Sequence, residues 1–187
     1  VEMTPLGDPF DRFRFPDGEE FSLPNSRAAY VAQLEDRFPA EVQKIRRYMR
    51  RVDHACMVSK LFFVLKSLPR WVDGAANRVL RAVTTDPWSH TTGEVFDSLG
   101  ISGKLRTVLS LHWGYYGSVP SRSSFGIHAL THSHFWNGAY YPKGGAVVFA
   151  EGMLKTVAAA GGEVLCGAEV GGLILEDGRA VGVSLAD

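Results

Sequence analysis

The stretch that decides the fold is Tyr140–Asp187, which reads YYPKGGAVVFAEGMLKTVAAAGGEVLCGAEVGGLILEDGRAVGVSLAD. Its Pro-Lys-Gly-Gly opening predicts a turn, and the apolar residues that follow predict a helix that ends at Gly161. Phe149, Met153 and Val157 recur every four residues in this helix, so we expect one stripe of it to be buried.

Short strands are expected after this helix. Val164 and Leu165 are predicted to form the first strand. Residues 181–185 alternate between large and small side chains, and we expect them to pair with residues 173–175 across an Asp-Gly turn at 177–178. Together with the helices predicted upstream, these strands place the chain in the α+β class.

The N-terminal part of the chain is predicted to be a hairpin followed by helices. Residues 11–24 alternate in polarity on both sides of a Pro-Asp-Gly turn, which predicts a β-hairpin. A helix is expected at 27–38, with Asn25 or Ser26 as its cap, and Pro39 starts another. Further helical segments are predicted at 71–83, at 93–99 behind a capping box of Thr91 and Glu94, at 103–113, and from a serine cap at 121–124 through His134.

The helix expected at 41–56 has an apolar side and a basic side. Apolar residues recur at intervals of three and four, while lysine and arginine occupy the opposite side. The basic side is either a solvated charged face or a surface for peripheral contact with anionic lipid head groups, to which the apolar run at 61–65 would add insertion depth. The two sets are Val42, Ile45, Met49, Val52 and Cys56, and Lys44, Arg46, Arg47, Arg50 and Arg51.

Composition excludes some partners. Lys plus Arg and Asp plus Glu both number 20, so there is no net charge to attract polyanions and nucleic acid is not an expected partner. Cys56 and Cys166 lie far apart with no CxxC spacing, which favours a reducing compartment. The sequence contains no apolar run long enough to span a membrane and does not open with a signal peptide. We therefore expect a cytoplasmic protein or one peripheral to a membrane.

Two groups of residues have the chemistry of candidate sites. His128 and His132 lie one helical turn apart and can share an ion, but His134 faces elsewhere and no carboxylate is near, so no metal site is predicted. Gly144-Gly145 at a helix N-terminus permits close approach of an anion or an electron-rich ring.

An aromatic group either lines a long apolar pocket or belongs to the core, and the sequence leaves both interpretations open. Its members are Trp113, Tyr115, Tyr116, Phe125, Phe135, Trp136, Tyr140 and Tyr141.

A series of motifs runs through the chain: DPF at 8–10, FPDG at 15–18, HWGYYGSVPSRSSF at 112–125, YPKGG at 141–145, GGEV at 161–164 and RAVGV at 179–183. In this order they resemble the phytoene desaturase, carotenoid isomerase and retinol saturase family of FAD-dependent oxidoreductases. The resemblance implies hydride transfer between FAD and a long apolar polyene, in desaturation, saturation or isomerisation.

The resemblance also implies a division of the chain. Residues 1–139 would be a mostly helical substrate-binding portion with the N-terminal hairpin, and residues 140–187 would be part of an incomplete, Rossmann-like FAD-binding domain. The Gly-x-Gly-x-x-Gly loop of such domains is not in this sequence. The chain starts on Val1 and stops inside a strand pattern. We therefore expect further segments on both sides, no tight FAD binding and no activity from this chain alone.

Site residues are carried over by position from the same resemblance, without any being assigned as an acid or a base. The residues expected near the cofactor are Lys143, Gly144, Gly145 and Val170, and those expected near the substrate are Tyr115, Tyr116, His128, Trp136 and Tyr141. The alternative is a stand-alone module that binds apolar ligands or membrane surfaces and has no redox activity. In either case an open sheet edge and an under-covered apolar stripe would favour oligomers of the isolated chain.

Overall fold

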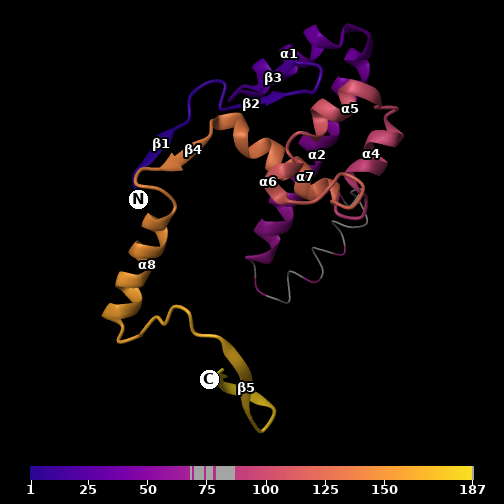
Figure 1. Ribbon diagram of the computed structural model, residues 1–187. Helices are drawn as coiled ribbons and strands as arrows, with labels where there is room; N and C mark the ends of the chain where they lie inside the picture. Colours follow the sequence, from indigo (N-terminus) through magenta and orange to yellow (C-terminus); the bar gives the residue numbers. More distant parts are fainter. Residues whose placement is uncertain (68, 70–73, 75–77, 79–86, 187) are drawn as a thin grey trace. The chain divides into compact units, whose positions relative to one another are not determined.

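The computed structural model describes residues 1–67, 69, 74, 78 and 87–186 (Figure 1). Except for Gly74 and Arg78, the helix predicted at 71–83 lies outside the described residues. The chain divides into two compact units, Pro5–Tyr140 and a second unit made of Val1–Thr4 with Tyr141–Asp187. The first unit is mainly helical and contains a small antiparallel hairpin, which confirms the α+β class.

The predicted hairpin is present. Strand β2 (Asp11–Arg14) pairs antiparallel with β3 (Glu20–Leu23), with Phe13 opposite Phe21. Phe21 is fully buried, so the inward side of β3 contributes to the core while its outward residues meet solvent.

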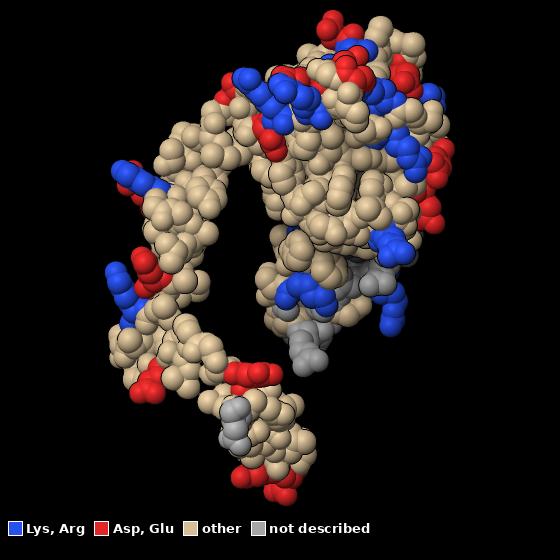
Figure 2. Space-filling model, viewed as in Figure 1, with Lys and Arg blue, Asp and Glu red and all other residues tan. Residues whose placement is uncertain are grey.

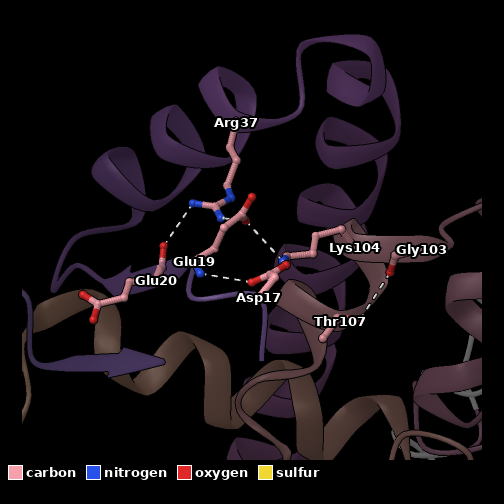
Figure 3. Close-up of polar contacts among 7 residues, drawn as sticks. All are labelled: Asp17, Glu19, Glu20, Arg37, Gly103, Lys104 and Thr107. Carbon is pink, nitrogen blue, oxygen red and sulfur yellow. Dashed lines mark hydrogen bonds and ion pairs between the residues drawn. The ribbon is translucent and has the colours of Figure 1, made fainter. Parts of the chain in front are cut away.

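Charged side chains hold the hairpin turn against two helices (Figure 3). Lys104 Nζ lies 2.6 Å from an Asp17 oxygen and 3.2 Å from a Glu19 oxygen. Arg37 forms an ion pair with Glu19 and donates to the Glu20 carbonyl at 3.0 Å. The Lys104 hydrogen bond lowers the pKa of Asp17, and the same contact raises the pKa of Lys104.

Helices α1 (Arg27–Arg37) and α2 (Val42–Lys66) follow the hairpin, joined by a 3₁₀ turn, η1, at Pro39–Glu41. The Ser26 hydroxyl accepts a hydrogen bond from the Ala29 amide, which confirms the predicted cap. The apolar side of α2 is buried as expected, but the helix continues ten residues beyond the predicted end at Cys56 and includes the apolar run at 61–65.

Four further α-helices lie among the described residues of the first unit. α4 (Thr92–Ser98) begins at the predicted capping box, and α7 (Phe125–His134) is capped by Ser124. The helix expected at 103–113 ends earlier, as α5 (Gly103–Ser110). A separate short helix, α6 (Trp113–Tyr116), follows, and Gly117 ends it with a φ of 72°. α7 is followed by a 3₁₀ turn, η2, at Phe135–Asn137.

The core of this unit forms where α2 packs against α7, with α1, α4 and α5 around them (Figure 1). Among the described residues, no helix is both long and apolar enough to cross a membrane. The largest fully buried side chains of the core are Tyr48, Phe21, Phe96, Leu23, Leu34, Ile45, Ile101, Leu105, Leu109, His112, His128 and His132.

Residues after Tyr140 form separate elements. β4 (Tyr140–Pro142) pairs with β1 (Met3–Pro5), and the division between the units falls within this two-stranded sheet. Helix α8 (Val147–Ala159) comes next, followed by the predicted hairpin of β5 (Val170–Glu176) and β6 (Arg179–Leu185). Figure 2 shows acidic and basic side chains along α8 and acidic ones on the β5–β6 hairpin.

Two expectations for this part were wrong. The α8 stripe is exposed, by 44% at Phe149 and 64% at Met153, because no described element packs over it. Val164 and Leu165 are not in a strand, since neither has a ladder partner in the part of the chain that the structure describes. Both segments are apolar in sequence, but no described element lies beside them to bury their side chains or to pair with their backbone.

Candidate functional site

A chain of buried hydrogen bonds crosses the core of the first unit. The Tyr48 hydroxyl lies 2.8 Å from His128 Nε2 and 3.3 Å from His132 Nδ1. The other ring nitrogen of His128, Nδ1, lies 3.0 Å from the Tyr116 hydroxyl. Tyr48, His128 and His132 are each at most 1% exposed, so these contacts replace hydration that the polar atoms lose on folding.

Helical spacing brings these groups together. His128 and His132 are four residues apart in α7 and share one face, as predicted. Tyr48 lies three residues after Ile45 and four before Val52, within the buried side of α2. Because α2 packs against α7, the tyrosine hydroxyl meets both rings.

Burial keeps the histidines neutral. Desolvation lowers the pKa of His128 to about 3 and that of His112 to about 4, and it holds the pKa of His132 well below its usual value. Neighbouring imidazoles lower the values for His128 and His132 further. Desolvation also raises the pKa of Tyr48 and of Tyr116, so both hydroxyls stay protonated. The cluster is therefore an array of neutral donors and acceptors.

The aromatic group around these histidines is closely packed. Phe135 stacks on Phe10 at 4.7 Å between ring centroids and contacts the Tyr115 ring at 5.0 Å. The cavity beside His132 has a volume of about 10 Å³, which is too small for a polyene. A larger cleft of about 240 Å³ lies between α2, α4 and the start of α7, and no residue predicted to contact substrate is among those that line it in the described chain.

Some of the residues predicted to contact substrate lie next to one another or beside the histidine cluster. Tyr116 and His128 share a hydrogen bond, and Trp136 packs on His132 with ring centroids 5.8 Å apart. The Tyr115 hydroxyl donates to Asp11, and 43% of the residue is exposed. Tyr141 belongs to the other unit and is exposed.

The residues predicted to contact the cofactor also lie in that other unit. Gly144 and Gly145 have φ angles of +92° and +87° and precede α8, whose N-terminus has no side-chain cap. A Cβ added at Gly145 meets nothing within 4 Å, so the backbone there is open to a ring or an anion. Lys143 Nζ lies 3.3 Å from Glu2, and Val170 is the exposed first residue of β5. The open space is at Gly145, because a Cβ at Gly144 would lie 3.0 Å from Val148.

Sequence reasoning missed Tyr48, Tyr30 and His112. All three are nearly fully buried, and Tyr48 joins the two α7 histidines. The available signal was the position of Tyr48 between Ile45 and Val52, because a buried tyrosine hydroxyl usually finds a polar partner.

No family model matches the chain. It is 33% identical over 99% of its length to the all-trans-retinol 13,14-reductase of Danio rerio, and 32% identical over 99% to that of Homo sapiens. It is 26% identical over its whole length to the phytoene desaturase (neurosporene-forming) of Cereibacter sphaeroides. A relative from Danio rerio that is 29% identical bears the name inactive all-trans-retinol 13,14-reductase.

Both of these groups of relatives match the family that the motifs of the chain resemble. Its homologues within that family are the all-trans-retinol 13,14-reductases and the phytoene desaturases. It spans about a third of the length of these relatives, 32% of the retinol reductases and 35% of the Cereibacter desaturase.

Replacing Tyr48 by phenylalanine is expected to lower the free energy of unfolding by about 1–3 kcal/mol, because a buried nitrogen on each of two histidines loses its partner. Tyr30→Phe is the comparison and should lose less stability, since the Tyr30 hydroxyl is equally buried but bonds no side chain among the described residues. Urea unfolding measures the free energy of unfolding of both variants. An equal loss in the two variants would contradict the assigned role of Tyr48.

Stability is also expected to fall as the pH drops below about 6.5. The folded pKa values of His112 and His128, about 4 and 3, lie below the unfolded value near 6.5, so the unfolded state binds more protons between these limits. Stability is fully present above pH ~6.5 and is lost by up to about 1.4 kcal/mol per pH unit for each buried histidine. Urea unfolding between pH 7.5 and roughly 5.5, above the carboxylate range, tests this. A flat profile in the parent chain would refute the expectation.

Proposed function

We propose that the chain is the substrate-domain portion, with part of the FAD-binding domain, of an oxidoreductase that acts on long apolar polyenes. The reaction would desaturate, saturate or isomerise a carotenoid- or retinoid-like substrate. The observation that carries this proposal is the 33% identity to an all-trans-retinol 13,14-reductase over 99% of the chain. Similarity to phytoene desaturases over the same residues supports a shared polyene chemistry.

FAD would accept or supply the hydride, and the chain's residues would position the reactants. Lys143, Gly144, Gly145 and Val170 would lie near the cofactor. The glycine pair would let a flavin approach the backbone at the start of α8, where unpaired amide groups favour an electron-rich edge.

The substrate would meet Tyr115, Tyr116, Trp136 and Tyr141, with His128 behind them. His128 is fully buried and hydrogen-bonded at both nitrogens, so its contribution would be to hold the hydroxyl of the half-buried Tyr116 in one orientation. A protonated phenol in that position is a hydrogen-bond donor rather than a base.

Residues 140–187 would pack against the rest of a FAD-binding domain. Their exposed apolar side chains support this assignment, since isolated domains rarely leave so many large ones uncovered. Without those contacts we expect this chain alone to bind FAD weakly, to be inactive and to form oligomers. The exposed side chains include Val147, Phe149, Met153, Leu154, Leu165, Val170, Leu173, Leu175 and Val181.

Expression of the full reading frame that contains this chain tests the proposal. The purified protein is expected to show the visible absorbance of a bound flavin, and incubation with all-trans-retinol or phytoene should change the substrate mass by a pair of hydrogen atoms or shift its double-bond geometry. A full-length protein that binds no flavin would overturn the proposal. A flavin-bound protein that converts neither polyene would retain the cofactor assignment and reject the substrate class.

Gly145→Ala in the full-length protein is expected to reduce flavin content, because the new methyl group occupies open space at the α8 N-terminus. Gly18→Ala is the matched control: Gly18 has a φ of +84°, similar backbone strain and equally open surroundings, but it lies in the N-terminal hairpin turn. Flavin absorbance per protein is the measurement. Equal loss in both variants would indicate strain alone.

A second candidate function, binding to a membrane surface, is favoured by one face of α2. Arg47, Arg50 and Arg51 are exposed and make no ion pair among the described residues, whereas Lys44 and Arg46 pair with glutamates. Further along the same helix, apolar side chains are exposed at Met57, Leu61 and Val64. A basic surface that continues into apolar side chains suits an anionic bilayer.

The double variant Arg47→Gln with Arg50→Gln is expected to weaken binding to anionic liposomes by about 30-fold, at about 1 kcal/mol for each basic residue near the surface. Arg122→Gln, at an exposed arginine outside α2, is the control. Co-sedimentation at two salt concentrations measures the effect, which should shrink at high salt. Binding that is unchanged by the double variant would exclude this face of α2.

A further inference from the structure

Four buried polar atoms converge on one small cavity. Tyr30 Oη, His112 Nδ1, His132 Nε2 and Trp136 Nε1 have no hydrogen-bond partner among the described residues. All four residues line the cavity beside His132, together with the apolar side chains of Phe10, Leu23, Pro24 and Phe135. Unpaired buried polar atoms are costly, and their gathering around one space indicates a shared partner.

The volume of the cavity limits which molecule could bind to these four atoms. Its volume is about 10 Å³, close to the space that one water molecule needs, and a buried water typically makes two to four hydrogen bonds. The ring centroid of His132 lies 4.3 Å from that of His112, 4.6 Å from that of Tyr30 and 5.8 Å from that of Trp136. Any larger ligand would have to displace these rings.

The hydrogen-bonding types also match water. The Trp136 indole can only donate, and a neutral imidazole nitrogen either donates or accepts according to its tautomer. Since His112 and His132 are neutral, each presents to the cavity one nitrogen that a water molecule can satisfy in either tautomer. Water has two donor and two acceptor positions, which equals the number of unpaired atoms.

We propose that this cavity binds one ordered water molecule, and that the water ends a continuous hydrogen-bonded chain that begins at the Tyr116 hydroxyl. The chain passes from Tyr116 to His128, from His128 to Tyr48, from Tyr48 to His132, and from His132 Nε2 to the water. This site does not depend on the proposed redox function.

The single hydrogen of the Tyr48 hydroxyl couples the two histidines. If His128 Nε2 donates to Tyr48, the tyrosine hydrogen is free to bond His132 Nδ1, which must then be unprotonated. If the tyrosine instead donates to His128 Nε2, His132 Nδ1 must donate to the tyrosine oxygen. His128 and His132 therefore hold the same tautomer, and a change in one ring requires a change in the other and in the water.

The first test measures tautomers by NMR in the full-length protein with ¹⁵N-labelled histidine rings. The spectra distinguish protonated from unprotonated ring nitrogens. We expect His128 and His132 to be protonated at the same nitrogen, either Nε2 in both or Nδ1 in both. Opposite tautomers would overturn the coupling, because one hydroxyl hydrogen cannot satisfy them.

The second test locates the water in a high-resolution crystal structure of the same protein. One ordered oxygen is expected within about 3.2 Å of His132 Nε2 and Trp136 Nε1. A collapsed cavity, or an ordered oxygen that contacts none of the four atoms, would refute the site.

Two variants separate the water from the rest of the chain. Trp136→Phe removes one donor from the cavity, and the water is expected to lose occupancy. Tyr116→Phe removes the far end of the chain, which does not line the cavity, so the water should remain. If the water persists unchanged in Trp136→Phe or disappears in Tyr116→Phe, the assignment of its partners is wrong.

Discussion

The hydrogen bond between Tyr48 on α2 and His128 on α7 is the constraint on which the helical unit depends. These helices supply the central contact of the core, and the tyrosine and histidine meet where both side chains are excluded from water. A polar pair in such a place is costly unless its partners are satisfied, so it restricts the packing to the register that joins them. An apolar contact of equal area would tolerate a shift of one helix along the other.

Local signals in the sequence were sufficient to predict most of the described helices and strands of this unit. The Pro-Asp-Gly turn, the Ser26 cap and the capping box at Thr91 each act over a few residues, and each is found as predicted. The histidine network could not be predicted in the same way, because Tyr48 and His128 are 80 positions apart and only the packing of α2 on α7 brings them together. His128 and His132 were placed on one face, but their partner was not visible.

The two units differ in how much of their apolar surface they bury by themselves. Residues 5–140 bury a continuous apolar core, within which five described side-chain atoms have no hydrogen-bond partner. Within residues 141–186, α8 has no buried residue, and the strands β5 and β6 pair only with each other among the described elements. The periodicity of α8 predicts an amphipathic helix correctly, yet it cannot say which surface covers the stripe. That is why the predicted burial of Phe149 and Met153 was wrong while the helix itself was right.

The electrostatics of the core restrict the part that its histidines can play in any reaction. Desolvation keeps His112, His128 and His132 neutral near pH 7, and the two on α7 are bonded to Tyr48. A general acid or base must reach the reacting atoms and exchange a proton near the working pH, and fully buried rings with pKa values of about 3 and 4 do not meet that requirement. What they can do is orient Tyr116, the partly exposed end of the network. In the proposed reaction the substrate would have to be held beside the cofactor, and a neutral hydrogen-bonded network that fixes a tyrosine would serve that purpose without exchanging a proton.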